Sequence, residues 1–291
     1  MIASLTSLWN LFRAEYLKVT GNRGVAIGLV WIFPVGAGIG TLLSILIMLG
    51  LPPQYRGGMS MSEALLSPWT VPGSELGRLL MLALTATVFA GEYQWGTWKN
   101  LIPRRQRTLL ALVKFVAVSA LMLVAFTLMS LVLWVSGALM CAVAGTPYEF
   151  GMTLDTFVQS FLIQLFLAFT VTLIGAGYAA VAAIFSRAIL GGIVIGIGMV
   201  IMELVGPALF ALLGNFLRVP QLAVVYLYTP GYNINNVTWW LRTNRPMEMG
   251  SNLSQYAAPH SLNVSLFILG VWVVGLITLT VILFRRQDVT T

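Results

Sequence analysis

Side chains that could do chemistry are few in this sequence, and none of them is grouped for catalysis. The single histidine, His260, follows Pro259 at an expected helix start, where a capping or turn role outweighs a catalytic one. The nine acidic residues are scattered and include no paired aspartates of the kind that hold magnesium and pyrophosphate. The sequence contains no Gly-x-Ser-x-Gly nucleophile motif and no Gly-Lys pair for a P-loop. We therefore expect a chain that is not an enzyme, that binds no cofactor or metal, and that depends on another chain for any use of ATP.

The chemically richest segment is a short charged stretch between two long apolar runs, at residues 93–107. Glu92 ends the apolar run that precedes it, and Gly96-Thr97 permits a turn. Pro103 would break a helix in the middle of the segment. Its other notable side chains are an aromatic and an aliphatic interface anchor and three arginines, namely Trp98, Leu101, Arg104, Arg105 and Arg107.

Two interpretations of residues 93–107 follow from the residue types alone. The segment can form a short helix parallel to the membrane, which would offer a rigid basic surface to a soluble partner. It can equally be a simple loop held in the cytoplasm by its arginines, because short loops rich in Lys and Arg tend to stay on that side.

Glu203 is the clearest buried charge in the sequence, about 15 residues and roughly 22 Å into an apolar run. Acidic residues inside membranes usually face protein or a water-filled cavity, so Glu203 is a candidate pathway or gating residue. The alternative is that Gly206-Pro207 ends the helix there and places Glu203 near the outer interface. Glu75 and Arg78, three residues apart, are interpreted as a local ion pair.

The composition of the chain is that of a membrane protein. Of its 291 residues, 58% are hydrophobic and only 9% are charged, and the mean hydropathy is +0.90. A soluble domain carries roughly 25% charged residues. The net charge of +7 comes from residues that flank apolar runs and form no continuous stripe, which argues against nucleic acid as a partner. The single cysteine, Cys141, excludes an internal disulfide and is expected to serve packing.

The apolar runs predict an all-α polytopic protein in a lipid bilayer, with six transmembrane helices in a single domain over residues 1–291. Each run is long enough to cross a hydrocarbon core of about 30 Å. The expected spans are Val25–Leu49, Ser74–Trp95, Thr108–Val143, Leu154–Phe185, Ala188–Leu213 and Leu262–Phe284.

The N-terminal residues 5–22 predict an amphipathic helix that lies in the membrane interface. Arg13, Glu15 and Lys18 lie off the expected apolar face and would face water. Asn22-Arg23-Gly24 favours a break before the first span, and the alternative is one straight rod. The apolar face would consist of Leu5, Leu8, Trp9, Phe12 and Tyr16.

The connection at residues 214–261 is long and rich in aromatic side chains, which are typical of a membrane-interface belt. We expect one or two short helices there, lying in or dipping into the outer leaflet. Residues 51–71 are expected to be a second outside segment. With these assignments, eleven of the sixteen Lys and Arg residues fall on one side of the membrane and five on the other. The imbalance predicts that both termini are cytoplasmic.

Small residues in the fourth and fifth spans predict close approach between helices. Packing within one chain is favoured over a dimer interface. These residues are Gly175, Gly177, Gly191, Gly192, Gly196 and Gly198.

Residues 92–114 resemble a known signature. Their order is similar to the G-E-x-x-x-G-T…L…P…R…K signature of ABC-2 type transporter permeases, with a looser spacing between Pro103 and the arginine that follows, either Arg105 or Arg107. The N-terminal helix, the six spans and the basic C-terminal end are also similar to this family. The residues that carry the signature are Glu92, Gly96, Thr97, Leu101, Pro103, Arg107 and Lys114.

The resemblance implies a half-transporter in a bacterial plasma membrane. Two permease chains, identical or different, would pair, and each would dock a separate ABC ATPase subunit that binds ATP and magnesium. The segment at 93–107 would be the coupling helix to that ATPase. It would then couple ATP hydrolysis to export of a substrate that the sequence does not identify. An alternative is a non-transporting ABC subunit that transmits ATPase motion to a periplasmic or extracellular partner through residues 214–261.

Overall fold

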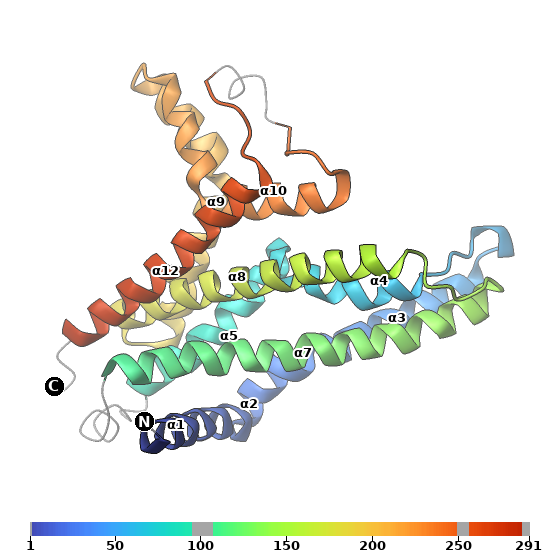
Figure 1. Ribbon diagram of the computed structural model, residues 1–291, viewed down its shortest axis with the longest axis horizontal. Helices are drawn as coiled ribbons and strands as arrows, with labels where there is room; N and C mark the ends of the chain where they lie inside the picture. The colour runs from blue at the N-terminus through green and yellow to red at the C-terminus, as the bar shows by residue number, and fades with distance from the viewer. Residues whose placement is uncertain (1, 95–106, 249–255, 287–291) are drawn as a thin grey trace. The chain divides into compact units, whose positions relative to one another are not determined.

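The computed structural model describes residues 2–94, 107–248 and 256–286, and within these ranges every regular element is a helix (Figure 1). Among the described residues, six helices are long and apolar enough to cross a membrane, which confirms the predicted all-α polytopic fold. Their bounds differ from the predicted ones by a few residues at most ends. They are α3 (Ile32–Gly50), α5 (Glu75–Gln94), α7 (Arg107–Ala144), α8 (Leu154–Ser186), α9 (Ile189–Phe216) and α12 (Leu262–Arg286).

The first span starts later than predicted. Helix α1 (Ile2–Gly21) ends just before a bend at Asn22, so the predicted break is confirmed. Between the bend and α3 lie a single helical turn, α2 (Arg23–Ala26), and a π-helical stretch, η1 (Ile27–Trp31). Such wide turns are rare and usually short. The long regular apolar helix therefore begins at Ile32 rather than at Val25.

The prediction for the charged face of α1 is wrong at one position. Leu8 and Trp9 are exposed, as expected for an apolar face directed at lipid, but Glu15 is buried together with Val19. These two residues are four apart and therefore share one face of the helix. The buried face of α1 thus includes an acidic group, whereas Arg13 and Lys18 are exposed as expected.

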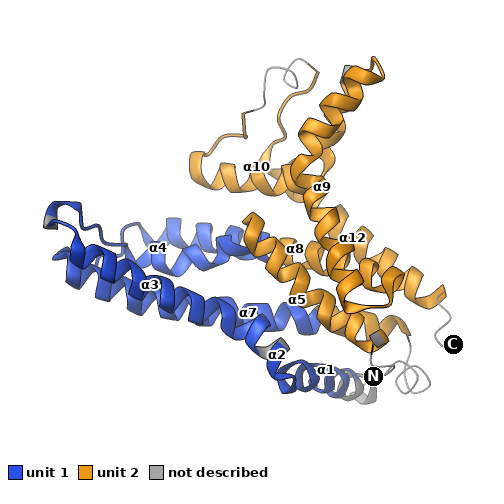
Figure 2. Ribbon diagram, turned by 180° about the vertical axis from the view of Figure 1, so that it is seen from behind, with its two compact units in different colours: residues 1–72, 116–168 blue, residues 73–115, 169–291 orange. Residues whose placement is uncertain are grey.

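The described residues divide into two compact units (Figure 2). The first comprises residues 1–72 and 116–168, and the second comprises residues 73–115 and 169–291. Helices α7 and α8 contribute residues to both units because their long sequences cross the boundaries at 115–116 and 168–169.

In the first unit, the predicted outside segment at 51–71 folds back into helical structure. It contains η2 (Pro53–Tyr55), α4 (Met61–Leu66) and the 3-10 helix η3 (Ser67–Gly73). The amide of Met61 donates to the carbonyl of Glu149 at 2.9 Å, and the Ser130 hydroxyl donates to the carbonyl of Leu65 at 3.1 Å. Aromatic rings with centroids 5.2–6.2 Å apart complete the packing, namely Phe33, Trp69, Phe126, Phe150, Phe157 and Phe161.

In the second unit, glycines bring helices close together. A Cβ atom on Gly196 of α9 would lie 2.6 Å from a terminal carbon of Leu82 in α5. A Cβ atom on Gly177 of α8 would lie 2.6 Å from the Cβ of Leu276 in α12. Separations this short leave no room for a side chain, so packing within the chain explains both glycines.

The described part of the connection at 214–261 contains two short helices, in agreement with the prediction of one or two. The 3-10 helix η5 (Pro220–Tyr228) leads into α10 (Pro230–Thr243). Thr229 caps α10 by accepting a hydrogen bond from the amide of Tyr232, and Pro230 occupies the first turn, where a missing N–H costs nothing. Asn244 ends the helix in the left-handed conformation, with a φ of 56°.

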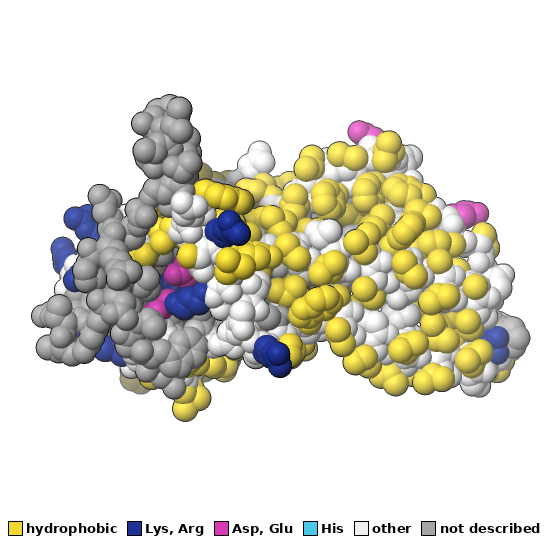
Figure 3. All heavy atoms as spheres, turned by 90° about the horizontal axis from the view of Figure 1, so that it is seen from below, with side chains coloured by type: hydrophobic (Ala, Val, Ile, Leu, Met, Phe, Trp, Pro, Cys, Tyr) yellow, Lys and Arg dark blue, Asp and Glu magenta, His cyan; other side chains and the backbone are white. Residues whose placement is uncertain are grey.

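The spans leave much apolar side-chain surface uncovered. In α3, the buried residues Pro34, Thr41 and Met48 are spaced seven apart and, with Phe33 beside Pro34, form one narrow stripe. The leucines and isoleucines around that stripe are exposed. Hydrophobic side chains dominate the face of the molecule drawn in Figure 3. A surface of this kind is suited to contact with lipid, and the chain is a multi-pass membrane protein.

We predict that Gly177→Ala destabilises the protein by roughly 1–3 kcal/mol, because the added methyl group overlaps Leu276 close to its backbone. The measurement is the midpoint of thermal unfolding in detergent. Gly175→Ala is the matched control, since it lies on the same helix and a Cβ atom there meets nothing within 4 Å. Equal midpoints for the two variants would contradict the assignment of Gly177 to helix packing.

Candidate functional site

A buried ion pair joins the facing ends of α5 and α7. The Nζ atom of Lys114 donates to Oε1 of Glu92 at 3.0 Å and to the backbone carbonyl of Val88 at 3.3 Å. Both charged side chains are only 1% exposed. Glu92 lies in the last turn of α5, and Lys114 lies two turns into α7. The pair therefore clamps the two helices immediately beside the point where the chain passes from one to the other.

The predicted coupling segment lies between these two helices. Of the sequence-predicted site residues there, Gly96, Thr97, Trp98, Leu101, Pro103, Arg104 and Arg105 lie outside the described residues. Glu92 and Arg107 are described, and they border the segment at its two sides. The Glu92–Lys114 pair thus ties together the two helices between which the segment runs.

Arg107 connects the same region to a third span. Its Nη1 atom donates to the backbone carbonyl of Arg285 at 3.2 Å. Arg285 lies in the last turn of α12, where carbonyl groups have no partner within the helix. A guanidinium at a helix C-terminus also interacts favourably with the helix dipole. The start of α7 is therefore linked both to the end of α5 and to the end of α12.

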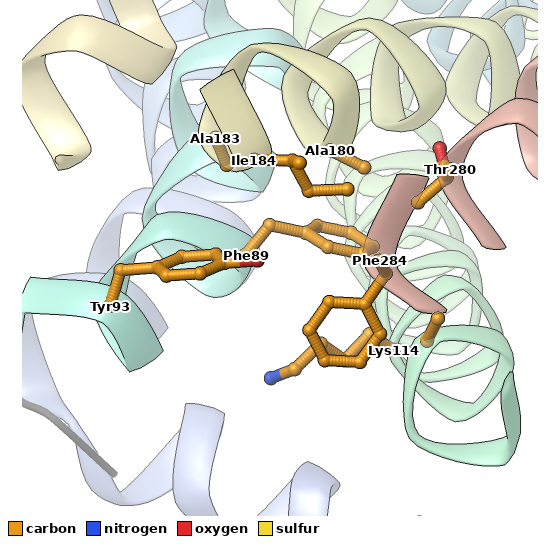
Figure 4. Close-up of a pocket in the computed structure, with 9 residues that line it drawn as sticks. Phe89, Tyr93, Lys114, Ala180, Ala183, Ile184, Thr280 and Phe284 are labelled. Atoms are coloured by element: carbon orange, nitrogen blue, oxygen red, sulfur yellow. The ribbon is translucent and has the colours of Figure 1, made fainter. Parts of the chain in front are cut away.

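A small cavity lies against the buried lysine. Phe89, Tyr93, Lys114, Thr280 and Phe284 surround it together with small residues of α8 (Figure 4). Its volume of about 10 Å³ accommodates roughly one water molecule. The Thr280 hydroxyl is already bonded to the carbonyl of Leu276 at 2.8 Å. The cavity is too small for a cargo molecule and is best regarded as a packing defect beside the ion pair.

The second charged cluster of this unit is centred on Glu203. Its carboxylate accepts hydrogen bonds from the guanidinium of Arg78 in α5 and from the hydroxyl of Tyr178 in α8. Glu203 is 8% exposed and Tyr178 is 6% exposed. Helix α9 continues through Pro207 to Phe216, so the prediction that the helix could end at Gly206-Pro207 is wrong.

The interpretation of Glu75 and Arg78 as a local ion pair is also wrong. Arg78 reaches Glu203 instead, and Glu75 is exposed. Sequence reasoning missed Tyr178 altogether, because a tyrosine in an apolar run carries no local signal of its partner. It also missed α4, although Ser60-x-x-Glu63 has the pattern of a helix-capping box, and Ser60 accepts a hydrogen bond from the amide of Glu63.

A polar network fixes the connection at 214–261. The Asn233 amide nitrogen donates to the carbonyls of Leu227 and Thr229, each at 2.8 Å, so its oxygen is directed at Nδ1 of His260, 3.4 Å away. Asn236 donates to the carbonyl of His260 at 2.9 Å and to the Ser265 hydroxyl at 2.8 Å. His260 thus belongs to this network, and its bonds hold α10 against the start of α12.

Comparison of the chain with protein-family models finds no match, and comparison with curated proteins finds none either. Across the described ranges, no group of three or more His, Cys, Asp or Glu side chains comes together as a metal site would require. The Glu92–Lys114 pair and the Glu203 cluster are therefore the structural observations on which a functional proposal can be built.

We predict that Lys114→Met destabilises the protein by about 3–5 kcal/mol, because it removes one partner of a buried ion pair while the Glu92 carboxylate stays buried. The double variant Glu92→Gln/Lys114→Met should regain more than about 1 kcal/mol of that loss, since no unpaired charge remains. Thermal or denaturant unfolding in detergent measures both. Strictly additive effects of the two substitutions would show that the pair does not act as a unit.

We predict that the connection at 214–261 loses stability as the pH falls below about 6.5, the ordinary pKa of histidine. Burial lowers the pKa of His260 in the folded chain, so the unfolded chain takes up the proton first and acid favours unfolding. The midpoint of thermal unfolding should be lower at about pH 5.5 than at about pH 8. His260→Gln should make this decrease smaller. If the variant shows the same decrease, His260 is not the group that makes the stability depend on pH.

Proposed function

We propose that this chain is the membrane-spanning permease subunit of an ATP-driven ABC exporter, a member of the ABC-2 type. Two features support the proposal. Residues 92–114 resemble the signature of that family, and the chain has six candidate membrane spans. The structural observation that carries most weight is the buried Glu92–Lys114 pair, because it gives the signature's acidic and basic residues a mechanical role.

The role follows from the position of the pair. A soluble ATPase that pushes on residues 93–107 applies force to both α5 and α7. Without a link between the helix ends, part of that force would only separate them. The Glu92–Lys114 pair, together with the bond from Arg107 to the end of α12, makes three span ends respond together. Force on the segment would then move α5, α7 and α12 as one body.

In this proposal the partner ATPase binds ATP and magnesium, and a second permease chain, identical or different, completes the transporter. Both termini and residues 93–107 lie on the cytoplasmic side of a bacterial plasma membrane. The surplus of Lys and Arg in the segments assigned to that side supports the orientation. ATP binding to the paired ATPases would rearrange the spans, and the cargo would bind the two arrangements unequally.

A second function is a non-transporting ABC subunit that passes ATPase motion to a partner on the other side of the membrane. The observation in its favour is the polar network of Asn233, Asn236 and His260. This network gives η5 and α10 a fixed form, as a surface that docks a protein requires. Reconstitution of the chain and its ATPase in vesicles separates the two functions. ATP hydrolysis without cargo movement, but with altered binding of an external partner, supports the second.

We predict that changing Arg104, Arg105 and Arg107 together to Ala lowers the amount of co-purifying ATPase roughly tenfold, since exposed charge contacts contribute up to about 1 kcal/mol each. The partner to test is the separate ABC ATPase subunit that the proposal requires, expressed together with this chain. The matched control changes three exposed arginines of the 214–261 connection, Arg218, Arg242 and Arg245, to Ala. Equal recovery of the ATPase with both triple variants would refute the coupling role of residues 93–107.

A further inference from the structure

We propose that α9 contains a hinge at Glu203 and Pro207, and that Arg78 and Tyr178 lock this hinge by holding the Glu203 carboxylate. The inference goes beyond the proposed function, because it concerns movement within one chain and needs no ATPase. It rests on Glu203 and Pro207 of α9, on Arg78 of α5 and Tyr178 of α8, and on the first turn of α10.

The hinge follows from the chemistry of proline. In an α-helix the N–H of each residue donates to the carbonyl four residues earlier. Pro207 has no N–H, so the carbonyl of Glu203 receives no such bond, and the proline ring crowds that carbonyl. Gly206 precedes the proline and adds no side chain that would stiffen the turn. Prolines inside helices are the commonest site of a sharp kink, and α9 contains its only proline here.

The lock acts on the same residue. The backbone carbonyl of Glu203 is the one that Pro207 leaves without its helical bond, and the side chain of Glu203 is the one that Arg78 and Tyr178 hold. Arg78 belongs to α5 and Tyr178 to α8, so two neighbouring spans fix α9 at its weakest turn. A buried ion pair contributes little net stability, but it favours one arrangement over others, which makes it suited to a switch.

The first turn of α10 covers the locked carboxylate. A Cβ atom on Gly231 would lie 3.1 Å from the Cβ and 3.2 Å from Oε2 of Glu203, so a side chain there would require Glu203 to shift by a few tenths of an ångström. The positive end of the α10 dipole also favours a negative charge there. Tyr226 of η5 packs at Gly206, the residue immediately before Pro207. The distal third of α9, residues 207–216, is followed in the chain by η5 and α10, the elements that contact Gly206 and Glu203.

A modest bend gives a measurable displacement. Residues 207–216 extend about 14 Å along the helix axis. A bend of about 20°, the size of a typical sharp kink, would move Phe216 by roughly 5 Å. Leu76, at the start of α5, is a suitable reference point because α5 carries Arg78 two residues further on.

The test measures distances between paired spin labels in the chain alone, reconstituted in lipid nanodiscs. Cys141 is first changed to Ser, and cysteines for the labels are placed at Leu76 and Phe216. The reference pair is Leu76 and Leu190, which spans α5 and the proximal half of α9 and does not cross the hinge. All three label sites are strongly exposed, at 72%, 85% and 73% for Leu76, Phe216 and Leu190.

With Glu203→Gln, which removes the charge that Arg78 attracts, the Leu76–Phe216 distances should shift or broaden by roughly 5 Å. The Leu76–Leu190 distances should remain unchanged. Pro207→Ala restores the N–H for the Glu203 carbonyl and should give a Leu76–Phe216 distribution narrower than that of the unchanged chain. The hinge is overturned if Glu203→Gln leaves both distributions unchanged, or if both pairs broaden to the same extent.

Two variants keep the test decisive if Glu203→Gln does not fold. Tyr178→Phe removes one hydroxyl from the lock and should broaden the Leu76–Phe216 distances less than loss of the charge would. Pro207→Ala alone tests the hinge. Unchanged distances in both variants overturn the proposal. Because no ATPase is present, failure here leaves the proposed function standing, and failure of ATPase co-purification leaves the hinge standing.

Discussion

A buried carboxylate in a membrane helix needs a cation close by, and this requirement fixes α5 at both of its ends. Near its start, Arg78 meets Glu203 of α9, and near its end, Glu92 meets Lys114 of α7. About 14 residues, or roughly 21 Å of helix, separate the two charged positions on α5. The helix therefore has two polar attachments to different neighbours, and its register against α7 and α9 cannot slip without exposing a charge to hydrocarbon.

The packing of the second unit is consistent with these two attachments. Small residues let α5 approach α9 at Gly196 and let α8 approach α12 at Gly177. Phe89 and Phe115, with ring centroids 5.1 Å apart, pack one turn from the Glu92–Lys114 pair. Apolar contacts of this kind are adaptable, because hydrocarbon side chains and lipid tails are nearly equivalent environments. The charged pairs supply the directional bonds that the apolar contacts lack. In the proposed exporter, the Glu92–Lys114 pair would receive force from the ATPase, and the Arg78–Glu203 pair would govern where α9 bends.

The sequence was sufficient to predict the spans, because long uncharged runs have few alternatives to crossing a membrane. It could not predict which charges meet. Arg78 and Glu203 are 125 residues apart, and Glu75, three residues from Arg78, was the nearer partner by sequence alone. Glu15 was placed in water because charges usually lie there, and only tertiary packing decides that its face of α1 is buried. The packing of residues 51–72 in the first unit depends on contacts with distant parts of the chain, including Ser130 of α7 and Phe161 of α8. Ser60 and Glu63 indicated only the local start of α4. The role of residues 93–107 stays a prediction.

The length of α7 has a consequence for the membrane that can hold this protein. From Phe115 to Ala144 the helix carries no charge, and these thirty residues rise about 45 Å, against a hydrocarbon thickness of about 30 Å. The surplus can be accommodated by inclination of the helix or by local stretching of the surrounding acyl chains. Either response makes the energy of the protein depend on acyl-chain length. Bilayer thickness thus becomes a physical variable to which this chain is coupled through the length of α7.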